Sequence, residues 1–182
     1  MENALNDIQT IIAAAAFAAE RHRGQRRKDA EASPYINHPL ALAQILAGEG
    51  GVTDAAVIAA ALLHDTVEDT ETTPAELEAR FGPRIAGLVA EVTDDKALPK
   101  QVRKDLQVAK AHAKSPGAKL VKLADKIANL RDLAASPPAD WSQERRAEYV
   151  RWAGAVVEGL RGTSPALEDA FDAARAAALA AV

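Results

Sequence analysis

The chain has 182 residues, of which 48% are hydrophobic and 26% are charged, and its formal net charge at pH 7 is −4. These values suit one soluble domain with a full hydrophobic core, so we expect residues 1–182 to form a single domain. The chain contains no cysteine, which excludes disulfides, thiolate metal sites and cysteine nucleophiles, and its acidic charge argues weakly against general nucleic-acid binding.

Helix signals follow one another along the whole chain. Alanine is abundant and is the best helix former, whereas aromatic residues make up only 4% of the sequence. The caps that we expect are Asn37, Asp54, Thr73 and Ser142, and Ser164 with Pro165 opens the last helix. The predicted helices cover about residues 6–24, 55–67, 74–82, 83–92, 98–114, 118–135 and 143–162. A further helix starts near residue 39 and ends between residues 48 and 51, and the last one runs from residue 165 onward.

No segment alternates between apolar and polar residues with a period of two for long enough to make a sheet. We therefore predict an all-α fold, with at most a short β-hairpin around residues 92–98. The longest apolar stretches, 11–19 and 55–63, are too short to cross a bilayer. The N-terminus lacks the basic start of a secretory signal, so we expect a cytoplasmic protein with no membrane partner.

A histidine and three carboxylates follow directly on an apolar segment, namely His64, Asp65, Glu68 and Asp69. Placing several carboxylates close together in a buried position is costly unless a cation neutralises them. In a continuous helix His64 and Glu68 share a face, as do Asp65 and Asp69. This spacing indicates a metal bound by His64 and Asp65, with Glu68 and Asp69 near a metal-bound water. An acidic, solvated helix end is the alternative interpretation.

Two other segments strengthen the metal hypothesis. His38 directly precedes Pro39, which restricts its backbone and suits a ligand, although a polar residue beside a helix start is the alternative. Asp125 lies among apolar residues of a helical pattern, an unusual place for a merely solvated aspartate. An ordinary ion pair of Asp125 with Lys122 or Arg131 is the alternative there.

The order His, His-Asp, Asp resembles the pattern of the HD-domain phosphohydrolases. The segments that more specifically resemble the hydrolase domain of RelA/SpoT proteins are 17–29, 34–39, 64–70, 91–96 and 122–132. This resemblance covers about residues 13–133, and the remainder resembles the stand-alone small alarmone hydrolases of the Mesh type. It implies an HD-domain helical bundle, with the C-terminal helices within 142–181 packing on the motif core.

The resemblance also implies an activity and a cofactor. Members of the family remove pyrophosphate from the 3′ position of guanosine tetra- and pentaphosphate, usually with one Mn²⁺ ion. Carried over by motif, the metal ligands are His38, His64, Asp65 and Asp125. Glu68 and Asp69 match the residues that activate or orient the attacking water. Zinc or iron is compatible with the same mixed nitrogen and oxygen donors.

A basic run at residues 26–28 precedes the first expected ligand. Because it is short and lies in an acidic protein, it favours a small phosphorylated ligand over nucleic acid; a solvated helix end is the alternative. The residues that we expect to contact the nucleotide are Arg27, Lys28, Tyr35, Asn129, Lys100, Arg103 and Lys104. Two other functions stay open: hydrolysis of another nucleotide such as NADPH, and a catalytically silent nucleotide-binding regulatory domain. The sequence makes no prediction of an oligomeric state.

Overall fold

The computed structural model describes the backbone of residues 2–182 and the side chains from residue 6 onward. The helices are α1 (Glu2–Arg21), α2 (Asn37–Gln44), α3 (Ala55–Leu63), α4 (Thr66–Asp69), α5 (Pro74–Val92), α6 (Lys100–Lys110), α7 (Pro116–Ala135), α8 (Gln143–Glu158) and α9 (Pro165–Ala180). A π-helical turn, η1, extends α2 over Ile45–Glu49, and a 3₁₀ turn, η2, follows α6 at Ala111–Ala113. The predicted all-α fold class is confirmed.

The prediction of a short hairpin around residues 92–98 is wrong. α5 continues to Val92, and an irregular turn follows it, in which Asp95 accepts hydrogen bonds from the backbone N–H groups of Ala97 and Leu98. An aspartate that bonds its own following backbone favours a turn over a strand. Within residues 2–182 no strand is formed, and the one antiparallel bridge joins Arg26 to Pro34.

Four of the predicted helix starts are confirmed by their capping bonds. The side chains of Asp54, Thr73, Ser142 and Ser164 each accept a hydrogen bond from a backbone N–H two or three residues further on. This arrangement satisfies one of the N–H groups that the first helical turn leaves unpaired. The cap expected at Asn37 is wrong, because Asn37 is itself the first residue of α2 and the residue before it has helical backbone angles with no capping side chain.

The helix expected over residues 55–67 is interrupted where the site begins. α3 ends at Leu63, and α4 starts again at Thr66, whose hydroxyl donates a 2.7 Å hydrogen bond to the carbonyl of Leu63. That bond gives the carbonyl a side-chain partner at the point where the helix ends. His64 and Asp65 therefore lie at a junction between two helices. The division predicted at Gly82 is confirmed, since its φ of 83° breaks the regular geometry within α5.

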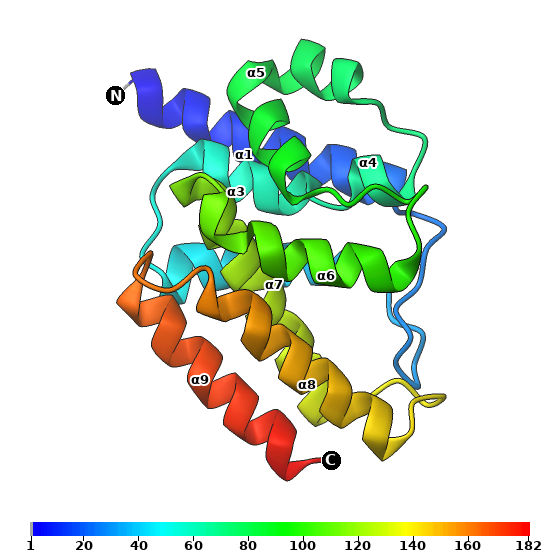
Figure 1. Ribbon diagram of the computed structural model, residues 1–182. Helices are drawn as coiled ribbons and strands as arrows, with labels where there is room; N and C mark the ends of the chain where they lie inside the picture. Colours follow the sequence, from blue (N-terminus) through cyan, green and yellow to red (C-terminus); the bar gives the residue numbers. More distant parts are fainter. Residues whose placement is uncertain (1) are drawn as a thin grey trace.

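Two helices carry most of the core. α3, in which nearly every side chain is buried, packs against α1, α2 and α5, and α7 packs against α9, α2, α3 and α5. Figure 1 shows α3 between α1 and the lower part of the molecule, with α8 and α9 side by side in front of α7. Among residues 2–182, no helix combines the length and the apolar character needed to cross a lipid bilayer.

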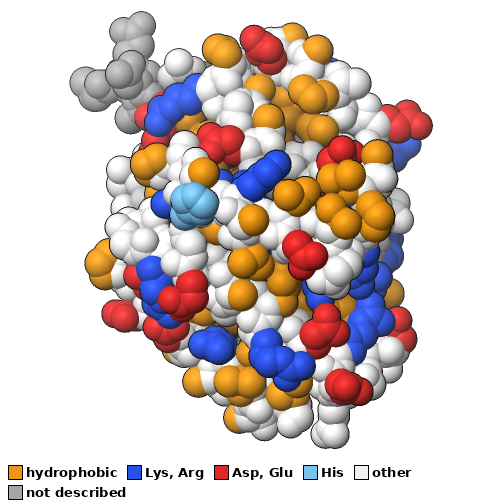
Figure 2. Space-filling view, viewed as in Figure 1, with side chains coloured by type: hydrophobic (Ala, Val, Ile, Leu, Met, Phe, Trp, Pro, Cys, Tyr) orange, Lys and Arg blue, Asp and Glu red, His pale blue; other side chains and the backbone are white. Residues whose placement is uncertain are grey.

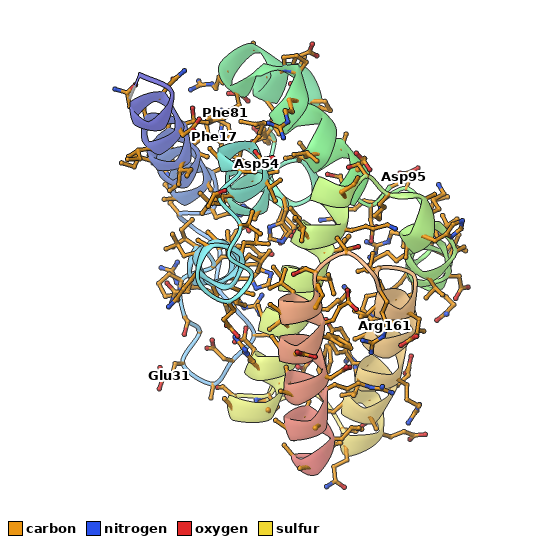
Figure 3. All side chains as sticks on the ribbon, turned by 90° about the vertical axis from the view of Figure 1, so that its left-hand side faces the viewer. Phe17, Glu31, Asp54, Phe81, Asp95 and Arg161 are labelled. Atoms are coloured by element: carbon orange, nitrogen blue, oxygen red, sulfur yellow. The ribbon has the colours of Figure 1, made fainter. Side chains whose placement is uncertain are left out.

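An aromatic and charged contact joins α1 to α5. Phe17 and Phe81 meet edge to face with ring centroids 5.5 Å apart (Figure 3). Glu76, in the first turn of α5, directs its carboxylate to Arg21 of α1 at 2.5 Å. This ion pair therefore ties the same two helices together.

The end of α8 approaches η2 so closely that a side chain at residue 159 would clash with η2. A Cβ atom on Gly159 would lie 2.6 Å from the Cβ of Ala111 and 3.1 Å from the backbone nitrogen of His112. Overpacking of this kind costs about 1–3 kcal/mol, so Gly159→Ala should lower the free energy of unfolding by that amount. Gly87→Ala is the matched control, because a Cβ at Gly87 meets nothing within 4 Å. Urea unfolding of both variants tests this, and equal stabilities would contradict it.

Candidate active site

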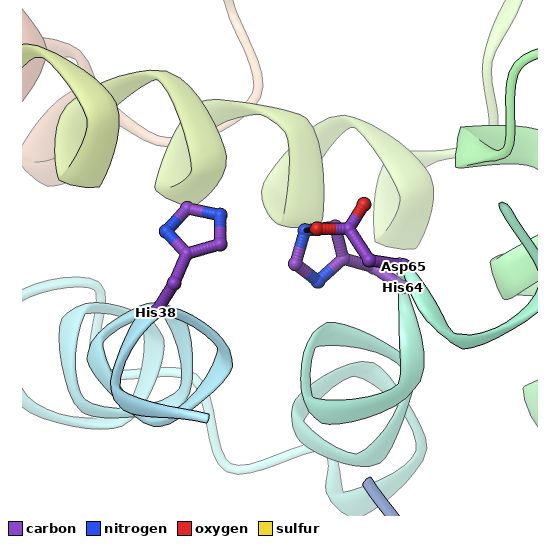
Figure 4. A group of neighbouring side chains, drawn as sticks. All are labelled: His38, His64 and Asp65. Carbon is purple, nitrogen blue, oxygen red and sulfur yellow. Dashed lines mark ion pairs between the residues drawn. The ribbon is translucent and has the colours of Figure 1, made fainter. Parts of the chain in front are cut away.

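Four side chains from three parts of the chain converge. His38 is on α2, His64 and Asp65 are at the junction of α3 and α4, and Asp125 is on α7. One ligand atom each of His38, His64 and Asp65 lies within 4.8 Å of the others, and Figure 4 shows the two imidazole rings under the ribbon of α7. The Oδ1 atom of Asp125 lies 3.4 Å from Nε2 of His38, which joins it to the group. The structure thus brings the predicted ligands together, and their role as ligands stays a prediction.

The chemistry of this four-residue centre fits a divalent cation. His38, His64 and Asp125 are less than 8% exposed, and two carboxylates at such a place call for a positive charge. Nδ1 of His64 lies 2.8 Å from the carbonyl oxygen of Ala61. Nδ1 donates to that oxygen, so Nε2 faces Asp65, 2.9 Å away, and in the neutral imidazole Nε2 offers its lone pair to a cation there. Two imidazole nitrogens and two carboxylates suit Mn²⁺, and also iron or zinc.

The charges of the centre follow from its neighbours. Burial raises the pKa of Asp65, but His64, His38 and the hydroxyl of Tyr35 together outweigh burial and lower that pKa well below its usual range. Burial likewise raises the pKa of Asp125, but Lys126, His38 and Lys122 together outweigh burial and lower that pKa well below its usual range. Burial lowers the pKa of His38. Both carboxylates are therefore anionic at neutral pH, as metal ligands must be, and His38 is neutral.

Glu68 and Asp69, the predicted catalytic carboxylates, both lie on α4 but have different partners. Oε2 of Glu68 accepts a 3.2 Å hydrogen bond from the backbone N–H of Asp94, and Oε1 lies 3.4 Å from Arg103. Asp69 pairs with Lys96. The side chain of Glu68 is 17% exposed and that of Asp69 is 31% exposed. Burial raises the pKa of Glu68, which is the direction that suits a proton acceptor near neutral pH.

The raised pKa of Glu68 predicts a pH-dependent cost to stability. Because the folded-state pKa exceeds the ordinary value of 4.5, ionised Glu68 lowers the free energy of unfolding as pH rises from 4.5 through the folded-state pKa. In chelator-treated protein, Glu68→Gln should therefore be more stable than wild type above that pKa, and the difference should vanish below pH 4.5. Thermal unfolding of both proteins across pH measures it, and a difference independent of pH would contradict it.

A hollow beside the centre contains four of the residues expected to contact substrate. It is lined by Arg27, Lys28, Tyr35 and Asn129, together with Trp141 and Tyr149 from the C-terminal part. Asn129 donates to Oδ1 of Asp125 at 2.6 Å and accepts from Arg27 at 3.2 Å, so it links the hollow to the centre. The hydroxyl of Tyr35, another residue expected to contact the nucleotide, donates to Asp65.

The other three residues line a second hollow. Lys100, Arg103 and Lys104 surround it, and it shares Trp141 and Tyr149 with the first hollow. Figure 2 shows Lys and Arg side chains along the right-hand edge of that face, where α6 begins. Basic groups thus lie on both sides of one aromatic pair, an arrangement that suits a ligand with phosphates at two positions.

Sequence reasoning missed Lys126 and assigned no role to Trp141. Nζ of Lys126 lies 3.0 Å from Oδ2 of Asp125 and 4.2 Å from the ring centroid of Trp152, and the residue is 3% exposed. The apolar residues around Lys126 could have indicated that this lysine is buried and paired with a carboxylate, since lysine is rarely buried without a partner. The alternative in which Asp125 merely pairs with Arg131 is wrong, because Arg131 binds Glu49 through two hydrogen bonds.

Comparison with known proteins agrees with this geometry. The model of the HD domain family matches residues 14–151. The chain is 58% identical to the guanosine-3′,5′-bis(diphosphate) 3′-pyrophosphohydrolase MESH1 of Xenopus tropicalis, over 92% of this chain and 93% of that protein. It is 59% identical to MESH1 of Homo sapiens, over 88% of this chain and 90% of that protein.

A solved structure agrees as well. It is described as a metazoan ortholog of SpoT that hydrolyzes ppGpp and plays a role in starvation responses. It is 49% identical to this chain, with a TM-score of 0.90 over 93% of this chain and 96% of that one. The chain therefore belongs to the HD domain family, and within it to the group of the MESH1 proteins.

Proposed function

We propose that this protein hydrolyses guanosine 3′-diphosphate 5′-diphosphate to GDP and pyrophosphate, and the pentaphosphate to GTP and pyrophosphate, with one divalent cation. The observation that carries the substrate assignment is the identity of 58% to a pyrophosphohydrolase of these compounds over nearly the whole chain. The buried His and Asp centre beside two basic hollows supports the same chemistry. We propose Mn²⁺ as the cation.

In this proposal His38, His64, Asp65 and Asp125 hold the cation. A divalent cation bound there would polarise a phosphoryl oxygen and lower the pKa of a bound water. Glu68 lies one turn beyond the junction on α4 and would accept the proton of the attacking water. The water oxygen bonds to the phosphorus attached to the 3′ oxygen, and the bond between that phosphorus and the 3′ oxygen breaks. The 3′ oxygen takes a proton, and pyrophosphate leaves.

The two basic hollows have separate tasks in binding. Arg27 and Lys28 line the hollow that Asn129 connects to Asp125, and in this proposal they bind the phosphates nearest the reacting bond. Lys100 and Arg103 line the other hollow and would neutralise the second phosphate group. Tyr35 holds Asp65 through its hydroxyl and lines the first hollow with its ring. The cytoplasmic location and the absence of a nucleic-acid partner stay predictions.

Chromatography of products from guanosine tetraphosphate, GTP and NADPH with Mn²⁺ tests the substrate. We expect GDP and pyrophosphate from the first and little turnover of GTP, which lacks a 3′-diphosphate. Lys28→Ala should raise KM, more so at low salt, where charge pairing is least screened, and should leave metal content unchanged. Lys110→Ala, an exposed lysine at the end of α6, is the control.

Four outcomes would overturn the proposal. Equal rates on guanosine tetraphosphate and GTP, or orthophosphate as the only released phosphate, would indicate a hydrolase of other nucleotides. Faster turnover of NADPH would point to that substrate class. Tight binding of guanosine tetraphosphate without turnover in any of Mn²⁺, Mg²⁺, Zn²⁺ or Fe²⁺ would indicate a silent regulatory domain.

A further inference from the structure

The helix that carries Glu68 cannot fix its own position. α4 comprises only Thr66–Asp69, and a helix of one turn has too few internal hydrogen bonds to be stable by itself. Its orientation therefore depends on contacts from other segments. The direction of the Glu68 carboxylate depends on whatever holds the two ends of this turn, together with its own contacts with Asp94 and Arg103.

Gln25 holds the C-terminal end of α4. Its Nε2 donates a 2.6 Å hydrogen bond to the backbone carbonyl of Asp69, the last residue of the helix. Its Oε1 lies 2.8 Å from Nδ1 of His22. An amide oxygen only accepts, so Nδ1 of His22 is the donor. His22 is 1% exposed, and by holding Oε1 it turns the amide so that Nε2 faces Asp69.

The same segment also holds the N-terminal end. The backbone carbonyl of Gln25 accepts a 3.1 Å hydrogen bond from the N–H of Tyr35, and the ring of Tyr35 lies 4.8 Å from that of His22. The hydroxyl of Tyr35 donates to Asp65, the residue directly before α4. Both ends of α4 are therefore tied to the segment between α1 and α2, through Gln25 and Tyr35.

We propose that His22 and Gln25 are positioning residues that hold α4 in the orientation from which Glu68 acts. The proposal rests on the proposed function for the identity of the reaction. Neither side chain belongs to the four-residue centre or lines the two basic hollows. Their loss should therefore lower kcat and leave KM and metal content unchanged.

Gln25→Leu tests the tie to Asp69, because leucine keeps much of the side-chain volume and removes both hydrogen bonds. Misplacement of about 1 Å costs as much as 10²-fold in rate, so we expect kcat to fall by about 10- to 100-fold. In a Glu68→Gln background the same change should have little further effect, since residues that act through one group are not additive. Multiplicative losses would overturn the proposal.

His22 offers a rescue that separates positioning from packing. His22→Asn keeps an N–H near the place of Nδ1 and should retain most of the turnover, whereas His22→Leu should not. If leucine served as well as asparagine, the role of His22 would be packing alone. Phe171→Leu in α9, at a fully buried residue, is the control for general destabilisation and should leave kcat near wild type below its unfolding temperature.

Hydrogen exchange gives a readout that does not depend on substrate. In Gln25→Leu, the amides of Asp69 and Thr70, which close the turn of α4 through hydrogen bonds of 2.8 and 3.1 Å, should exchange faster than in wild type. Unchanged exchange would overturn the positioning role even if the substrate were another nucleotide. An inactive wild-type protein with faster exchange in the variant would contradict only the proposed function.

Discussion

Glu68→Gln is expected to lower kcat by about 10²- to 10⁴-fold while metal content stays near that of wild type. The carboxylate of Glu68 accepts from the backbone N–H of Asp94, and an amide oxygen can accept the same bond. The local structure should therefore survive the change. The variant loses the ability to accept a proton, because an amide does not take up a proton at neutral pH. Steady-state kinetics with guanosine tetraphosphate and elemental analysis of the purified variant give the two quantities.

Two comparison variants make this result specific. Glu71→Gln removes a carboxylate from an exposed residue just after α4 and should be neutral. Asp69→Asn removes the partner of Lys96 and should cost less than Glu68→Gln, because the side chain of Asp69 is the more exposed of the two. A larger loss in Asp69→Asn would identify Asp69 as the proton acceptor. Turnover of Glu68→Gln restored by added metal would instead place Glu68 among the ligands.

Local rules predicted the helices well because their signals are short in range. A capping side chain such as that of Asp54 or Ser142 bonds a backbone N–H only two or three residues away, so the sequence contains both partners side by side. The same holds for Gly82, which only needs a backbone conformation that other residues avoid. The fold class follows from these signals and from the lack of alternation.

The junction between α3 and α4 shows where such rules fail. At the break, the hydroxyl of Thr66 donates a hydrogen bond to the carbonyl of Leu63. Such a side-chain bond competes with the backbone hydrogen bonds of a helix, and the helical period of apolar residues does not predict it. His64 and Glu68 therefore do not lie on one continuous helix, although their spacing of four residues suggested a shared helix face. The order of the motifs along the chain still predicted that His64 and Asp65 lie together with His38 and Asp125, because that order does not depend on where a helix ends.

The environment of the centre was less accessible from the sequence. Arg27 pairs with Asp132 at 2.6 Å although 105 residues separate them, and Trp141 reaches the first hollow from the far end of the chain. Contacts of this kind arise from the packing of helices, so no local pattern predicts them. Lys126 is next to Asp125 in the chain, yet successive residues on a helix point in different directions, and their contact follows from the burial of both.

Asp125→Asn is expected to abolish tight binding of the cation. Its Oδ1 faces His38 at 3.4 Å, and the carboxylate also contacts Lys126 at 3.0 Å and Asn129 at 2.6 Å. Loss of an outer partner of a metal ligand costs about 10- to 100-fold in affinity, so removal of a ligand charge should weaken Mn²⁺ binding by more than about 100-fold. Without added metal, turnover should fall to background.

Thermal unfolding measures this loss independently of turnover. A ligand that binds only the folded state at 100 times its Kd adds about 2.7 kcal/mol to the free energy of unfolding. Mn²⁺ should therefore raise the Tm of chelator-treated wild type and of Asp169→Asn, which changes an exposed aspartate of α9, but not that of Asp125→Asn. A variant that kept both the Mn²⁺-dependent rise in Tm and its turnover would show that Asp125 is not a ligand. The cation would then be bound by the group of His38, His64 and Asp65 alone.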